Sequence, residues 1–362
     1  MLLSLLVICL VFGVLTEGIF FYPRNIALLA RQTTIVGVLA IGMMFVIVAG
    51  HIDLSVGSVL GFCGTLAGVL QVWMGWPTLP TIILVILTGM ICGAWHGYWV
   101  AYRRVPAFII TLGGLLIFKG AKFGLSKSMS IAPMNPSFSM LGQSYIPAAI
   151  GWILALCAIV AVIVLILRKR QSKIKYNFKT VPFTVDAAKA VAISMLIVAA
   201  VFYLNKYRGI PAPVLIMVVL ALIFAFVANS TVFGRSIYAI GGNREASSLS
   251  GIKTKLTTLY IFIISGGLAA VAGIILTARL DAATPAAGDT MELDAIAACI
   301  IGGTNLMGGS GKVSGVIVGA LVMASLDNGM SLINLENYWQ FVVKGLVLTF
   351  AVWASTMSSK TA

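Results

Sequence analysis

PVLIMVVLALIFAFVANS, residues 213–230, is an apolar run without one charged side chain, and the polar, glycine-rich GRSIYAIGGNREASSLSGI (234–252) separates it from the next apolar run at 257–277. An uncharged run of this length predicts a helix that crosses a membrane. Similar runs recur along all 362 residues, of which 60% are hydrophobic and 9% charged. Strand-like alternation is absent, and Gly and Pro lie inside the apolar runs. The sequence therefore predicts an all-α polytopic membrane protein, a helical bundle rather than a barrel.

The bundle is expected to contain about ten transmembrane segments, some of them broken, within one transmembrane domain over residues 1–362. A short amphipathic piece is predicted at 22–33, and an apolar core at 291–302 is expected to cross or fold back. A basic connector at 168–186 divides the chain into pseudo-halves of about 1–167 and 187–362. The main spans are predicted at 2–22, 33–50, 56–74, 80–102, 107–125, 148–167, 187–204, 213–230, 257–277, 313–326 and 339–354.

The net charge of +14 comes from side chains concentrated in alternate loops, at 103–104, 168–179 and 235–255. The positive-inside rule places these loops in the cytoplasm, with both chain ends on the same side. No basic patch interleaves with aromatic residues on a soluble surface, so the charge indicates the lipid bilayer and not nucleic acid. The opening MLLSLLVICLVFGVL has no basic leader or cleavage site and is expected to remain as a first span.

Cysteine and phosphate-loop patterns argue against redox, metal and nucleotide chemistry. The five cysteines all lie in apolar runs and form no CxxC pair, so we expect small buried hydrophobes and not disulfides or metal ligands. GGSGKVS (308–314) lacks the hydroxyl residue after lysine and the glycine spacing of a phosphate loop. The chain by itself is predicted not to be an ATPase or any other enzyme.

GHIDLSVGS (50–58) interrupts apolar sequence with the carboxylate of Asp53. A charge at the bilayer centre costs roughly 2.5–3.5 kcal/mol, so Asp53 should face a cavity, a partner group or water. Asp53 or Ser55 can cap a helix that begins near Val56. One interpretation places Asp53, Ser55 and Ser58 on a solute path; the alternative is a cap at the membrane surface without solute contact.

A second polar constellation, DAATPAAGDTMELDAIAACIIGGTNLMGGSGKVSG (281–315), is rich in acidic and glycine residues. Capping of half-helices and a solvated extracellular rim are favoured over a metal site, because the segment lacks ligands at metal spacing. Asp294 and Asn305 are further candidate path residues. This segment and residues 50–58 each combine an acidic residue with a glycine-rich break, which is compatible with an internal repeat.

The polar segment at 234–252 has the signals of a short helix on the cytoplasmic face. Gly242 ends one element, Asn243 is a good N-cap, Glu245 falls in the first turn and Gly251 is placed to stop the helix. Ala246 belongs to its small-residue face. An ordinary connector is the alternative interpretation.

Four stretches together resemble the inner-membrane permease of bacterial ABC monosaccharide importers: RQTTIVGVLAIGMMFVIVAGHIDLSVGSVLG, PAFIITLGGLLIFKG, GRSIYAIGGNREASSLSGIKT and ELDAIAACIIGGTNLMGGSGKVSGVIVGALV. The resemblance covers about residues 24–354, and GAWHGYWVAYRRVPAFI, NKYRGIPAPVL and ASLDNGMSLINLENYWQ are most similar to its xylose members. The sequence departs from the family at His51, where Gly or Glu is more usual, and at His96, where Asn is more usual.

This resemblance implies a permease that forms the translocation path for a monosaccharide, expected to be xylose, in the bacterial inner membrane. It implies a dimer with a second permease copy, a cytoplasmic ABC ATPase that uses ATP and Mg²⁺, and a periplasmic sugar-binding protein. It also implies that the coupling helix at the ATPase interface contains Gly242, Asn243, Glu245, Ala246 and Gly251. The alternative function is an ion-coupled secondary sugar transporter, for which Asp53 would be the titrating carboxylate.

Overall fold

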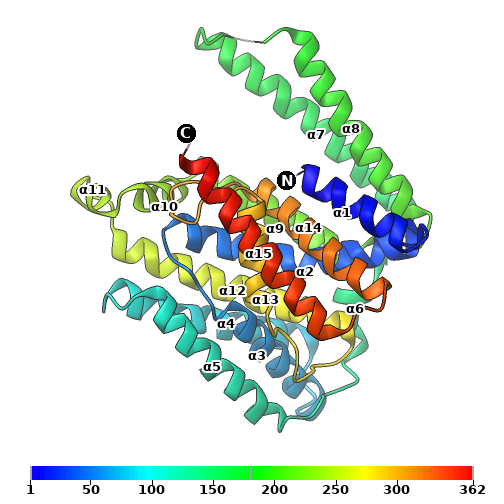
Figure 1. Cartoon of the computed structure of the whole chain (residues 1–362), viewed down its shortest axis with the longest axis vertical. Helices are drawn as coiled ribbons and strands as arrows, with labels where there is room; N and C mark the ends of the chain where they lie inside the picture. The colour runs from blue at the N-terminus through cyan, green and yellow to red at the C-terminus, as the bar shows by residue number, and fades with distance from the viewer. Residues whose placement is uncertain (1, 180, 361–362) are drawn as a thin grey trace.

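The computed structural model describes residues 2–179 and 181–360, which fold into an almost entirely helical bundle (Figure 1). Within these residues, nine helices are long and apolar enough to cross a membrane, counting α3 together with the π-helical turn that extends it. They are α2 (Pro23–Val48), α3 (Val56–Gly68) with η2 (Val69–Trp73), α4 (Thr78–Ala101), α5 (Ala107–Ser126), α7 (Ala148–Lys175), α8 (Phe183–Asn205), α9 (Ala212–Ser230), α12 (Thr254–Leu280) and α14 (Val313–Leu332).

Several shorter elements, together with the first and last helices of the chain, complete the fold. The short strands β1 and β2 pair antiparallel, with Tyr145 opposite Pro211. The remaining elements are α1 (Leu2–Leu15), η1 (Ile19–Phe21), α6 (Pro136–Gln143), β1 (Tyr145–Ile146), β2 (Ile210–Pro211), α10 (Val232–Gly242), α11 (Arg244–Leu249), α13 (Met291–Ile301) and α15 (Asn337–Lys360).

The three largest differences from the predicted boundaries are in α2, in α1 and in the connector between α7 and α8. The segment 22–33 is not a separate amphipathic piece, because Pro23 starts α2 at its first turn and the helix continues without a break to Val48. The first span is shorter than 2–22, since α1 ends at Leu15 and a turn leads into η1. The connector is shorter than 168–186, because α7 continues to Lys175 and α8 begins at Phe183.

The centre of the bundle is formed by α2, α3 with η2, α12 and α14, whose most apolar stretches are 89%, 78%, 72% and 72% buried. Small residues allow the backbones to approach closely, as is usual between membrane helices. A Cβ added to Gly42 of α2 would lie 3.1 Å from Ser265 Cα of α12. A Cβ on Gly89 of α4 would overlap the Gly266 carbonyl oxygen. The apolar core is therefore built on glycine contacts between helices.

The hairpin of α7 and α8 extends beyond the rest of the bundle in Figure 1, and only 11% of each apolar stretch is buried. Arg170 and Asp186 join its two helices by an ion pair of 2.8 Å. Cys63, Cys92 and Cys299 are buried as predicted, whereas Cys157 of α7 is exposed because this helix faces outward.

The two ends of the bundle carry different features. At one end, the end of α2, the loop between α4 and α5 and the α10–α11 segment lie together; we call this the α11 end. At the opposite end, Asn25 at the start of α2 and Asn328 near the end of α14 exchange amide hydrogen bonds of 2.8 and 3.0 Å. The α11 end carries Arg103 and Arg104, and is the end that the loop charges predict to be cytoplasmic.

Candidate functional site

The six residues of α11 form a capped helix outside the long spans. The Asn243 side chain accepts a hydrogen bond of 2.9 Å from the Ala246 N–H, and Glu245 lies in the first turn. Gly251 follows the helix with φ of +84°, a conformation that glycine adopts without strain. The predicted N-cap, first turn and stop at Gly251 are confirmed. Their role in coupling stays a prediction.

Most of α11 is exposed, and Ser247 is its one buried residue. Leu249 is 85% exposed at the end of the helix, and Met307 is 84% exposed in the loop after α13. Sequence reasoning missed both residues. The available signal was a large apolar side chain inside a polar segment between spans. Because no other part of the described chain covers these side chains, they are suited to contact a partner.

A backbone contact joins α10 to the break between α2 and α3. A Cβ on Gly241 would overlap the Val48 carbonyl oxygen and lie 2.5 Å from the Gly309 nitrogen. Gly309 donates a hydrogen bond of 2.9 Å to the same Val48 oxygen, and the Tyr238 hydroxyl donates one of 2.9 Å to the Gly311 carbonyl. The segment leading to α11 is thereby attached to α2 and to residues 302–312.

Asp53 lies in a buried polar cluster. Its Oδ1 accepts hydrogen bonds from the Ser55 N–H at 2.9 Å and the Ser55 hydroxyl at 2.5 Å. Ser55 Oγ lies 3.4 Å from His96 Nδ1 of α4, and the Ser265 hydroxyl of α12 donates to Asp53 Oδ2 at 3.5 Å. Asp53 is only 2% exposed. The carboxylate is therefore stabilised by hydroxyl and amide donors rather than by water.

This geometry corrects the predicted cap. Ser55 occupies the N-cap position of α3, but its side chain makes no capping hydrogen bond. Asp53 does not reach into the helix either, because its Oδ1 is bound to Ser55 itself. The hydrogen bonds between Asp53 and Ser55 therefore lie within the loop 49–55 and do not cap α3.

The two predicted breaks meet in the fold. A Cβ on Gly57 in the first turn of α3 would overlap Glu292 Oε2 and lie 2.5 Å from the Gly288 carbonyl oxygen. Residues 288–292, where α13 begins, therefore lie against the start of α3, next to buried Ser58. The two segments are far apart in the sequence, so their contact could not be predicted from it.

The remaining candidate path residues lie elsewhere. Asp294 is paired with Lys344 of α15 at 2.9 Å, and the same Lys344 Nζ lies 2.9 Å from Asp327 of α14. Asn305 lies in the loop 302–312 at the α11 end, where its side chain accepts from the Met307 N–H at 3.0 Å. The five predicted residues thus occupy three places, and their contact with a solute stays a prediction.

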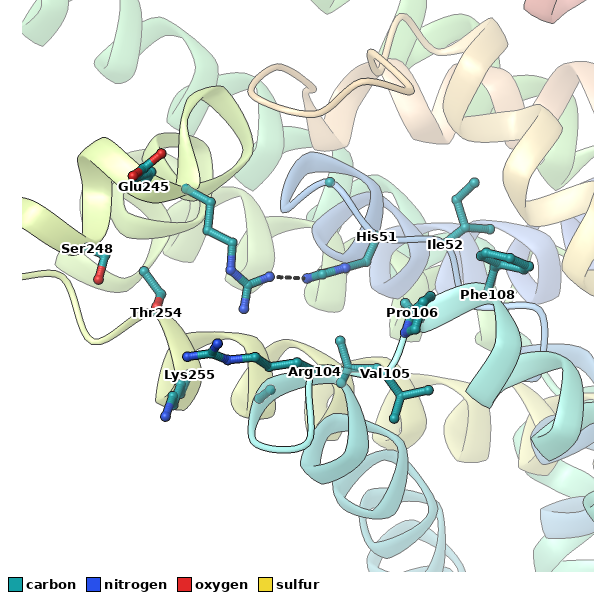
Figure 2. Close-up of a pocket in the computed structure, with 15 residues that line it drawn as sticks. His51, Ile52, Arg104, Val105, Pro106, Phe108, Glu245, Ser248, Thr254 and Lys255 are labelled. Atoms are coloured by element: carbon teal, nitrogen blue, oxygen red, sulfur yellow. Dashed lines mark hydrogen bonds between the residues drawn. The ribbon is translucent and has the colours of Figure 1, made fainter.

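A cavity of about 730 Å³ lies at the α11 end (Figure 2). The loop after α2, the loop between α4 and α5, α11 and the start of α12 line it. Arg244 and His51 meet across it, with Nη1 3.2 Å from Nε2. Burial, and then the charge of Arg244, lower the pKa of His51 to about 4, so the imidazole is neutral at physiological pH.

The helical fold and the family match together define a polytopic transport permease. The chain belongs to the family described as "Branched-chain amino acid transport system / permease component", whose match covers residues 25–352. It is one component of a transport system and not an enzyme. Its relatives and its apolar helices make it a multi-pass protein of the inner membrane.

Curated relatives align over nearly the whole chain. The "Xylose transport system permease protein XylH" of Escherichia coli (strain K12) is 44% identical over 99% of this chain and 92% of its own length. XylH of Haemophilus influenzae is 46% identical, covering 99% of this chain and 96% of its own length. The "Ribose import permease protein RbsC" of Bacillus subtilis is 32% identical, covering 97% and 90%. No solved structure matches this chain.

Proposed function

We propose that this chain is the membrane-spanning subunit of an ATP-driven ABC importer for xylose. The observation that carries the proposal is the identity of 44–46% to xylose permeases over 99% of the chain. Ribose permeases reach 32–33%. The family description names branched-chain amino acids, but the full-length relatives with the higher identities are named for a pentose, so a pentose is the substrate class we adopt.

The proposed transporter is a dimer of this permease with cytoplasmic ATPase subunits and a periplasmic sugar-binding protein. ATP and Mg²⁺ are used by the ATPase, and this chain performs no covalent chemistry on the solute. The ATPase docks on α11, where Asn243 caps the helix and Glu245, Ala246 and Leu249 are exposed. Support for this position comes from the exposure of the segment and from its backbone contact with Val48 through Gly241.

The test is uptake of labelled xylose by cells without other pentose importers, supplied with this permease, its ATPase and its binding protein. We expect xylose to accumulate and ribose to be taken up more slowly. Replacing Glu245 and Ala246 with Trp should abolish uptake while membrane insertion and expression remain. Trp at Lys173 and Lys175, which are exposed at the end of α7, is the matched control and should leave uptake unchanged.

Two results would contradict the proposal. Normal ATP-coupled uptake in the Glu245 and Ala246 double variant would remove α11 from the coupling interface. Concentration of xylose by the purified permease alone, in liposomes with an ion gradient and no ATPase, would instead establish an ion-coupled transporter. In that case Asp53, the buried carboxylate of the polar cluster, would be the first residue to replace.

A further inference from the structure

The cavity at the α11 end is lined by an excess of cationic side chains. Arg104, Arg244 and Lys255 border it, and Glu245 is the one carboxylate among its lining residues. Figure 2 shows Arg104 and Lys255 along one side, with Glu245 near the opposite rim. Among the residues that the structure describes, none of the three cations has a carboxylate within ion-pair distance.

His51 does not balance this charge. The Arg244 guanidinium has only N–H donors, so His51 Nε2 accepts the hydrogen bond of 3.2 Å as a neutral ring. Burial, and then the nearby charge of Arg104, lower the pKa of Arg244. A group of like charges around one cavity is stabilised when an anion occupies it.

The other wall of the cavity is apolar. Ile52, Val105, Pro106 and Phe108 line it, and Phe108 is 54% exposed in the first turn of α5. Only 17% of the apolar stretch of α5 is buried, so most of this apolar helix is exposed on the outside of the bundle. The cavity therefore combines a cationic side with an apolar side, beside an apolar helix with an exposed face and at the end of the spans. Basic pockets in this position are suited to phospholipid headgroups.

We propose that this cavity binds an anionic phospholipid, with its phosphate among Arg104, Arg244 and Lys255 and its glycerol and first acyl carbons against Val105 and Phe108. A volume of about 730 Å³ is within the usual range for a small-molecule site. Because Arg244 begins α11, the lipid contacts the segment on which we place the ATPase. The binding itself does not depend on the proposed importer function, since it is a property of this chain alone.

The test is a titration of fluorophore-labelled phosphatidylglycerol with the purified permease in neutral detergent, read by fluorescence anisotropy. The Arg104→Gln/Arg244→Gln variant should weaken binding about 25-fold, because each cation near a lipid phosphate contributes about a fivefold factor. Lys255→Gln should weaken it about fivefold for the same reason. The matched control is Arg103→Gln/Lys253→Gln, which removes the same charge from adjacent positions outside the cavity and should change affinity by less than about twofold.

Arg103 is suited to this control because its guanidinium lies 5.7 Å from the Tyr98 ring centre and is not among the lining residues. Thermal unfolding of each variant verifies that it is folded, and Lys255→Gln, a substitution of an exposed side chain, keeps the test available if the double variant is unstable. Equal loss in the two double variants would show unspecific surface attraction and overturn the proposal. So would equally tight binding of labelled phosphatidylcholine. Displacement by glycerol 3-phosphate at the affinity of the lipid would assign the cavity to a soluble phosphate compound instead.

Discussion

The contact at Gly241 provides a sharp test of how the α10–α11 segment is attached to the membrane helices. Gly241 and Gly242 are adjacent at the end of α10, and neither has a positive φ. A Cβ on Gly241 would overlap the Val48 carbonyl oxygen and lie 2.5 Å from the Gly309 nitrogen, whereas a Cβ on Gly242 would meet nothing within 4 Å. Gly241→Ala and Gly242→Ala therefore make the same chemical change with opposite steric consequences.

The expected magnitudes follow from this difference. Forcing an added carbon into packed backbone costs about 1–3 kcal/mol, and here backbone atoms must move because no side chain can rotate away. Alanine in a helix gains about 0.5–1 kcal/mol over glycine at both positions. Since all three nearest atoms belong to backbone, we take the upper cost of about 3 kcal/mol and subtract the helix gain, so Gly241→Ala should lower the free energy of unfolding by about 2 kcal/mol. Gly242→Ala should leave it unchanged or slightly raised.

The assay is thermal unfolding in detergent of variants that carry Cys9→Ser and Cys157→Ser, because these two thiols are not buried. A thiol-reactive dye then labels Cys63, Cys92 and Cys299 only when these buried residues become accessible. At about 2 °C per kcal/mol for a chain of this size, Gly241→Ala should lower Tm by about 4 °C. An equal Tm for the two variants would refute the assigned contact between α10, Val48 and Gly309. A lower Tm for Gly242→Ala than for Gly241→Ala would do the same.

Three further predictions concern charge and exposure. Lys344→Met leaves the carboxylates of Asp294 and Asp327 without their shared cation, which should cost about 3–5 kcal/mol and lower Tm by about 6–10 °C. Lys344→Arg keeps the cation and should stay within about 2 °C of the unchanged protein. Equal Tm values for the Met and Arg variants would contradict the ion pairs. The pKa of His51 is about 4 in the fold and 6.5 in the unfolded chain, so the unfolded state binds more protons between these two pH values. The contribution of neutral His51 to the free energy of unfolding is therefore fully present above pH 6.5 and is smaller by about 1.4 kcal/mol at pH 5.5. His51→Gln should remove that component of the pH dependence of Tm, and an unchanged profile would refute the assignment. Leu249→Asp should leave Tm unchanged and reduce the amount of ATPase that co-purifies, because Leu249 is 85% exposed; full co-purification would exclude it from the interface.

The sequence predicted what depends on local composition. Nine of the predicted spans and the short helix after Asn243 follow from hydropathy and capping signals and agree with the described structure. The predicted span 2–22 does not, because α1 has only 14 residues. The sequence did not predict that α2 continues through residues 23–33. Polar residues such as Arg24 and Arg31 give this segment the pattern of a surface helix, and the sequence does not show how it packs at that end of the bundle. The ion pairs of Lys344 join positions 50 and 17 residues away, and single-sequence patterns carry no information about such partners.

Residues 49–55 connect the α11 end of the bundle to the buried polar cluster around Asp53. Val48, which precedes this segment, accepts a hydrogen bond from the Gly309 N–H and lies against Gly241. At the other end of the segment, Ser55 lies next to His96 of α4 and Asp53 accepts a hydrogen bond from Ser265 of α12. The contacts of Gly241 with Val48 and Gly309 are between backbone atoms, so no side chain can rotate to accommodate a displacement of α10. A buried carboxylate costs roughly 2.5–3.5 kcal/mol in a membrane helix, and Asp53 offsets that cost with donors from its own loop and from α12. The break after α2 thus makes a stiff link between the α11 end and the interior of the bundle, which a flexible loop of the same length would not provide.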